Sequence, residues 1–156
     1  MFQRQPWMQR AGEFPASDTE YHELLARAVF SGGLGPKVVE SRWPGMKEAF
    51  GGFDPATVGA MGADDVARLL ADAGVIRNRR KIEAVVENAR VFQTIVGEHG
   101  GFHSWLLQLE AGTDLESAGV VLAERFRHLG PASSALFFFS AGWRIVEEAQ
   151  LVESTA

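Results

Sequence analysis

The chain has 156 residues, 46% of them hydrophobic and 22% charged, so residues 1–156 are expected to form one folded domain rather than a disordered chain. The formal charge of −5 argues against a domain that is basic over its whole surface, and the lack of cysteine excludes disulfides and thiolate metal sites. No stretch approaches the roughly 18 to 20 apolar residues that span a bilayer, and the N-terminus lacks the apolar segment of a signal peptide, so we expect a cytoplasmic protein without membrane contact.

Helical periodicity dominates the sequence, and no segment shows the sustained alternation that marks a strand. The first predicted helix starts at Ser17 and leads into residues 21–30. Residues 31–36, with three glycines and a proline, end it. A second helix is predicted over residues 37–50, with Pro44 ending or kinking it.

The next helix is short and starts at Asp54-Pro55, an N-cap and first-position pair. The clearest helix covers residues 78–96, where apolar residues recur on one face at three- and four-residue spacings. Further helices are predicted over residues 64–72, 102–109, 115–127, 131–141 and 144–152. The sequence therefore predicts an all-α, compact domain of about eight short helices.

The run DAGVIRNRRKIEA at residues 72–84, followed by NAR at 88–90, resembles the DNA-3-methyladenine glycosylase I family. Other stretches match that family's order and spacing: FGGFDP at 50–55, DDVARLL at 64–70, HLGP at 128–131 and FSAG at 139–142. The resemblance implies the helix-hairpin-helix DNA glycosylase fold and damaged double-stranded DNA as partner. It also implies excision of an alkylated base such as 3-methyladenine after base flipping.

Two segments are expected to contact DNA. The turn Leu129-Gly130-Pro131-Ala132 leads into a helix whose free N–H groups and dipole suit a phosphate. The second segment has four cations within residues 77–81, namely Arg77, Arg79, Arg80 and Lys81. Such a cluster supplies affinity without choice of sequence, although a solvated helix start is the alternative interpretation.

The resemblance also locates a base pocket and shows where the chain departs from the family. Aligning residues 32–34 with the family's AGL places Ala28 where a pocket glutamate belongs and Pro36 where a pocket tryptophan belongs. Trp7 is retained as an aromatic wall. The candidate pocket residues are Trp7, Tyr21, His22, Ala28, Ser31 and Gly35. The alternatives are that Trp7 only pins its segment to the core, that Tyr21 and His22 lie in the core or on the surface, and that residues 31–35 are a simple loop.

Catalytic and metal-binding residues are not assigned. Glu23 and Glu40 are the nearest carboxylates available to replace the missing glutamate. No lysine or aspartate occupies the position where the resemblance predicts catalysis, so hydrolysis is expected without a covalent lysine intermediate. The family's zinc ligands, two cysteines and two histidines, are missing, and we expect neither metal nor cofactor.

Two hypotheses of function remain open. The first is a monomeric DNA glycosylase, because a cationic base is already a good leaving group and needs little beyond positioning. The second is a catalytically degenerate module that recognises damaged or bent DNA without excision, which the missing glutamate favours. An unrelated role on an inherited fold is the remaining alternative.

Overall fold

The computed structural model describes residues 2–110 and 114–144, and within these ranges every regular element is a helix. The elements are α1 (Asp18–Ser31), α2 (Pro36–Ala49), the 3-10 turn η1 (Gly51–Phe53), α3 (Pro55–Gly59), α4 (Ala63–Ala71), α5 (Arg79–His99), α6 (Phe102–Glu110), α7 (Leu115–Arg125) and α8 (Pro131–Ser140). The all-α prediction is confirmed. The helix predicted over residues 144–152 lies, apart from Arg144, outside the described residues.

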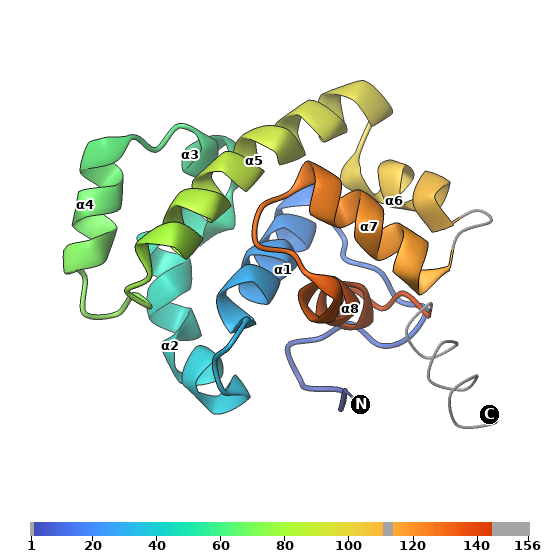
Figure 1. The fold of residues 1–156 in the computed structure, drawn as a ribbon, viewed down its shortest axis with the longest axis horizontal. Helices are drawn as coiled ribbons and strands as arrows, with labels where there is room; N and C mark the ends of the chain where they lie inside the picture. Colours follow the sequence, from blue (N-terminus) through green and yellow to red (C-terminus); the bar gives the residue numbers. More distant parts are fainter. Residues whose placement is uncertain (1, 111–113, 145–156) are drawn as a thin grey trace.

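Helix α1 occupies the centre of the arrangement and contacts α2, α5, α6 and α8 (Figure 1). The elements α2 to α4 lie on one side of it, and α6 to α8 lie on the other (Figure 1). Helix α5 packs against α3, α4, α1 and α6 and so links the two sides. Both sides therefore depend on α1 and α5 for their relative position.

Helix starts lie where the sequence predicts them, because a cap is a local interaction. The Ser17 hydroxyl accepts a hydrogen bond from the Glu20 N–H at 3.2 Å. The Asp54 carboxylate accepts from the Thr57 N–H at 2.9 Å, ahead of Pro55. Each bond satisfies an N–H group that has no acceptor within its own helix.

Of the two outcomes predicted at Pro44, an end or a kink of the second helix, the end is wrong, because α2 continues to Ala49. Pro44 lacks an N–H and so costs α2 one internal hydrogen bond. The residues around it are nevertheless held by packing: the buried Trp43 ring stacks on Phe53, with ring centres 5.0 Å apart and planes 8° apart. Gly45 lies so close to Gly74 that an added Cβ would be 2.9 Å from the Gly74 carbonyl oxygen. Tertiary packing outweighs the local preference here.

Candidate functional site

A groove lies between the end of α1, the start of α2 and the start of α8, with the N-terminal segment along one side. Its volume is about 860 Å³, within the usual range for small-molecule sites. Among the residues that line it are four of those predicted from the sequence: Trp7, Ser31, Gly35 and Ala132. The structure thus brings predicted base-pocket residues beside a predicted DNA-contacting residue, although the two groups are distant in sequence.

Main-chain hydrogen bonds hold the N-terminal segment, which carries Trp7, against the C-terminal end of α8. The Gln9 N–H donates to the Ser140 carbonyl, and the Gly12 N–H donates to the Gly142 carbonyl, both at 2.8 Å. Gly142 has a φ of +84°, and a Cβ there would overlap the carbonyl oxygen of Glu13. Only glycine fits this close approach, so the position of Trp7 depends on Gly142.

The loop between α1 and α2 forms one rim of the groove. Ser31 donates its hydroxyl hydrogen to the Arg27 carbonyl at 2.7 Å, which closes the last turn of α1. Gly35, the N-cap of α2, is exposed and leaves open space where a side chain would lie. A ligand can therefore approach the main chain closely at this rim.

Lys81 differs from the other cations of its cluster. Its ammonium donates to the Phe30 carbonyl at 3.2 Å and to the Gly32 carbonyl, at the C-terminal end of α1. Partial burial lowers the pKa of this group. A cation at a helix C-terminus is stabilised by the helix dipole, so Lys81 ties α5 to the loop at the groove.

Arg77, Arg79 and Arg80 are exposed near the start of α5. Arg79 lies 3.4 Å from the carboxylate of Glu83, one turn along the helix, and exposed pairs of this kind contribute little. These three guanidinium groups are therefore accessible to a phosphate, and contact with DNA stays a prediction for them.

The predicted DNA-contacting turn at residues 129–132 combines a buried anchor with an exposed helix start. Leu129 is buried, whereas Gly130, Pro131 and Ala132 are exposed. Gly130 is the N-cap of α8 and offers no side-chain acceptor. The N–H groups of Ala132 and Ser133 occupy the first turn of the helix and have no acceptor within it.

Three predicted pocket residues do not reach the groove: Tyr21, His22 and Ala28 each have an exposed fraction of only 1%. The Tyr21 hydroxyl lies 2.6 Å from His103 Nδ1 and accepts a hydrogen bond from the Trp143 indole N–H at 3.3 Å. His22 Nδ1 lies 2.6 Å from the carbonyl oxygen of Phe53. All three lie on the part of α1 that faces the core, and none of them lines the groove.

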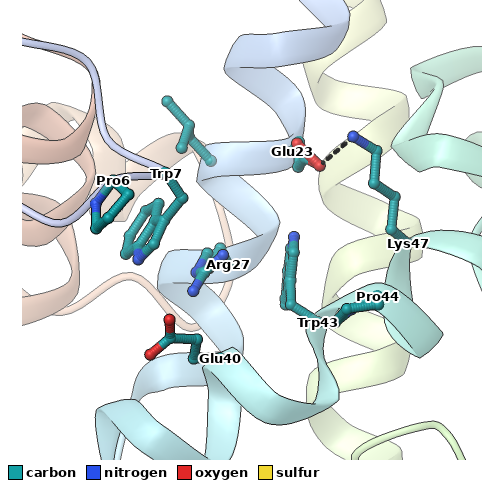
Figure 2. A pocket seen from close by; sticks show the side chains of 9 residues that line it. Pro6, Trp7, Glu23, Arg27, Glu40, Trp43, Pro44 and Lys47 are labelled. Atoms are coloured by element: carbon teal, nitrogen blue, oxygen red, sulfur yellow. Dashed lines mark ion pairs between the residues drawn. The ribbon is translucent and has the colours of Figure 1, made fainter.

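Arg27 and Trp43 are the residues at this site that the sequence analysis missed. The guanidinium carbon of Arg27 lies 3.6 Å from the centre of the Trp7 ring and 5.1 Å from that of Trp43. We call these three residues the tryptophan slot; Figure 2 shows Arg27 lying between the two indoles. Arg27 and Trp7 also line the groove, so the slot and the groove adjoin. The signal that could have revealed Arg27 is a cation within the apolar run of α1.

Two carboxylates border the slot, and they differ in availability. Glu23 lies 3.1 Å from the ammonium of Lys47 and is engaged by it (Figure 2). Glu40 is exposed and lies on α2 beside Arg27 (Figure 2). Desolvation lowers the pKa of Arg27, while the negative charges of Glu40 and Glu23 act in the opposite direction. Of the described residues that line the groove, Glu40 alone carries a carboxylate.

The zinc site that the family resemblance implies does not fit this chain. The sequence has no cysteine, and residues 129–156 contain no histidine. Within the described ranges, no three His, Asp or Glu side chains are grouped to hold a metal ion. The hydrogen bonds of Gln9 and Gly12 to the end of α8 connect the N-terminal segment to the fold without a metal.

Comparison with known proteins agrees with this architecture. Solved structures of 3-methyladenine DNA glycosylase I include a variant in complex with 3-methyladenine, with a TM-score of 0.78 and 22% identity over 90% of this chain and 89% of that one. The enzyme from Staphylococcus aureus also gives a TM-score of 0.78, at 22% identity over 90% of this chain and 88% of its own. The shared fold is therefore that of 3-methyladenine DNA glycosylase I.

Sequence comparison identifies the family. DNA-3-methyladenine glycosylase 1 of Escherichia coli is 36% identical over 83 residues, which cover 51% of this chain and 44% of the relative. A DNA-3-methyladenine glycosylase of Haemophilus influenzae is 41% identical over 46 residues, or 30% of this chain and 25% of its own. The aligned segments thus span less than half of these relatives. No helix in the described ranges is long and apolar enough to cross a membrane. Residues 8–135 match the methyladenine glycosylase family, and the chain belongs to it.

Proposed function

We propose that this protein hydrolyses the N-glycosidic bond of an alkylated base in double-stranded DNA after flipping that base into the groove. The base named for its relatives is 3-methyladenine. The observation that carries the proposal is the shared groove, which joins Trp7 to the start of α8 at Ala132. When a base is held against Trp7, the phosphate backbone of the DNA next to that base would lie within reach of the start of α8.

Phosphate binding rests on two features that flank the groove. The unpaired N–H groups at the start of α8 and the positive end of its dipole favour an anion. The exposed Arg77, Arg79 and Arg80 add charge just before and at the start of α5, whose first turn is tied to the groove rim by Lys81. Contacts of this kind position the duplex without reading its sequence. The formal charge of −5 is a total and does not exclude a local cationic surface, because Arg77, Arg79, Arg80 and Lys81 stand within five residues.

Hydrolysis breaks the C1′–N bond of the nucleotide and one O–H bond of a water molecule. The C1′–N bond cleaves with its electron pair on the departing base, the oxygen of a water molecule bonds to C1′, and a proton from that water ends on the base. Trp7 supplies an aromatic face for the extruded base. Glu40 is the carboxylate that the groove offers to orient the water. One chain supplies every residue of the groove, so we expect the monomer to be active.

A second candidate function is recognition of damaged or bent DNA without excision. The observation that favours it is the tryptophan slot, where a guanidinium already covers the face of Trp7. Ala28 is buried and provides no group that could replace a glutamate. A protein of this kind would hold an extruded base loosely and release the DNA unchanged.

Release of free bases from methylated DNA tests the proposal. Purified protein is incubated with the DNA, and the released bases are separated by chromatography. We expect release by the native protein and a large reduction in the double variant Arg79→Ala/Arg80→Ala. Arg68→Ala is the control, because Arg68 is an exposed arginine on α4 away from the groove. Binding to the same DNA without any release would refute the enzyme and leave the second candidate. If the protein neither binds the DNA nor releases a base, both candidate functions are refuted.

A further inference from the structure

Trp7 lines the groove although no regular element carries it. Residues 2–16 contain turns and bends but neither helix nor strand. The hydrogen bond from the Gln9 N–H to the Ser140 carbonyl fixes the path of this segment, but it does not fix the direction in which the indole of Trp7 points. The ring is only partly buried. A ring that is to receive a planar base must be held by its neighbours, because otherwise its rotational freedom is lost only when the base binds.

Arg27 provides such a hold on the ring. Its guanidinium carbon lies 3.6 Å from the centre of the Trp7 ring, over one face of the indole (Figure 2). Arg27 belongs to the central helix α1 and is only 6% exposed. A guanidinium is planar and positively charged, so it stacks on an indole and is attracted by the electron-rich face of that ring. This attraction is stronger where water is excluded, as it is around a side chain so deeply buried.

A series of ring contacts holds Arg27 in turn. Trp43 lies on the other side of the guanidinium, with its ring centre 5.1 Å from the guanidinium carbon (Figure 2). Trp43 stacks on Phe53, and Phe53 stacks on Phe50 with ring centres 5.1 Å apart and planes 11° apart. Both phenylalanines are fully buried. The contacts therefore run from the core through Trp43 and Arg27 to Trp7 at the groove.

A charge buried at this position needs a reason, because an apolar side chain would fill the same space at a lower cost in free energy. Arg27 Nε is fully buried and has no hydrogen-bond acceptor, which is unfavourable. Desolvation lowers the pKa of Arg27, and the negative charges of Glu40 and Glu23 offset this effect only in part. What a guanidinium adds to the slot is a flat cationic surface that holds an indole by its face.

We propose that Arg27 is a positioning residue, which holds the indole of Trp7 in the orientation in which the ring forms one wall of the groove. This inference rests on the proposed function, because it takes a flipped base to be the group that stacks on Trp7. Arg27 acts in this role only through Trp7. Because the ring is fixed before the base arrives, the base binds without the entropic cost of ordering the ring.

Fluorine NMR tests the orientation of Trp7 without any ligand. The full chain is labelled with 5-fluorotryptophan, and the signals of its four tryptophans are assigned by replacing each in turn with phenylalanine. Arg27→Met removes the cation and should shift or broaden the signals of Trp7 and Trp43. The signals of Trp105 and Trp143 should keep their positions. Arg27→Lys keeps the charge but loses the planar group, so it should restore the Trp7 signal in part.

Arg125→Met is the matched control, because the exposed Arg125 lies over another indole, with its guanidinium carbon 6.0 Å from the ring centre of Trp105. This variant should move the Trp105 signal alone. A Trp7 signal that Arg27→Met leaves unchanged would overturn the inference. Equal shifts of all four signals would also overturn it, because they would give Arg27 a merely structural role. If Arg27→Met does not fold, Arg27→Lys decides, and a Trp7 signal at its native position would then overturn the inference.

Binding of 3-methyladenine, the base named for the relatives, connects the orientation of Trp7 with the groove. Trp7→Ala removes a stacking ring and should weaken binding roughly tenfold. Arg27→Met should weaken it by a similar factor, and the double variant should bind no more weakly than Trp7→Ala alone, because Arg27 acts through Trp7. Additive losses would overturn the inference. If the native protein does not bind this base, the proposed function is contradicted, whereas the fluorine spectra still decide the role of Arg27.

Discussion

The side chain of Asn88 holds the main chain of Arg127 at both of its hydrogen-bonding groups. Asn88 Nδ2 donates to the Arg127 carbonyl at 3.0 Å, and the Arg127 N–H donates to Asn88 Oδ1 at 2.7 Å. Asn88 is buried on α5, and Arg127 begins the turn that leads through Leu129 into α8. This one amide therefore fixes the start of α8, and with it one wall of the groove, relative to α5.

Replacing Asn88 with alanine should destabilise the protein by about 2–3 kcal/mol, because it leaves a main-chain N–H and a carbonyl without their partner. DNA affinity should fall as well, since the start of α8 is no longer anchored. Urea denaturation gives the first quantity, and titration of a labelled duplex gives the second. Gln93→Ala is the matched control: this amide is exposed on the same helix and donates to the Pro55 carbonyl at 3.0 Å, away from α8. Equal losses in the two variants would contradict the role given to Asn88.

The salt dependence of DNA binding should separate Lys81 from the arginines near it. A cation that touches a phosphate contributes about one to the slope of log K against log salt. Arg79→Ala and Arg80→Ala should therefore reduce the slope, whereas Lys81→Met should leave it unchanged, because the Lys81 ammonium is bonded to main-chain carbonyls.

Lys81→Met should instead lower stability by about 1 kcal/mol, because those hydrogen bonds are removed. The measurement is affinity at four or five salt concentrations for each variant, with urea unfolding in parallel. A reduced slope for Lys81→Met at unchanged stability would show that Lys81 contacts phosphate after all.

Gly142→Ala should displace the N-terminal segment that carries Trp7. The substitution adds a Cβ that overlaps the Glu13 carbonyl and forces alanine into a φ of +84°. We expect a loss of about 2 kcal/mol or more and weaker base binding. Gly33→Ala is the control, since Gly33 has a φ of +76° with open space around it and should lose only about 1 kcal/mol. Similar losses for the two variants would indicate that backbone strain alone accounts for the effect.

Much of the fold could be predicted from the sequence, because its signals are local. The side chains of Asp54 and Asn78 start helices by accepting hydrogen bonds from the N–H groups three residues later in the chain. Each cap can therefore be predicted from a few consecutive residues. The local signal of Pro44 left an end or a kink of the second helix open, and only the end is wrong. What keeps α2 intact there is the packing of Trp43 on Phe53 and of Gly45 on Gly74, and neither contact is visible in a short window.

The site was less predictable because it joins segments that are distant in the chain. Helical periodicity indicated that Tyr21 and His22 lie on the first helix, but it could not tell a core-facing position from a groove-facing one. Arg27 was missed because its partners, Trp7 and Trp43, come from the N-terminal segment and from α2. The groove residues Trp7, Ser31, Gly35 and Ala132 were identified through the family resemblance, which carries information on tertiary contacts that periodicity lacks.

His22 should make the protein sensitive to mild acid. Burial lowers its pKa from 6.5 to about 4, and the Phe53 carbonyl and Asp54 only partly offset this effect. Between these two values the unfolded chain takes up a proton that the folded chain does not, so stability falls as the pH decreases from about 6.5 to about 4. The free energy of unfolding should fall by about 3 kcal/mol over this range, and above pH 6.5 none of this loss is present.

The test compares urea unfolding of the native protein and of His22→Gln at several values of pH. Glutamine can keep a hydrogen bond to the Phe53 carbonyl but does not titrate, so the variant should lose less stability between pH 6.5 and 4. The pKa of Asp54 is also lowered, by hydrogen bonds from Thr57, but its ordinary value is 3.8 and its contribution is lost at lower pH. Asp54→Asn should therefore leave the slope in the upper window nearly unchanged, and identical slopes for the native protein and His22→Gln would show that His22 is not its cause.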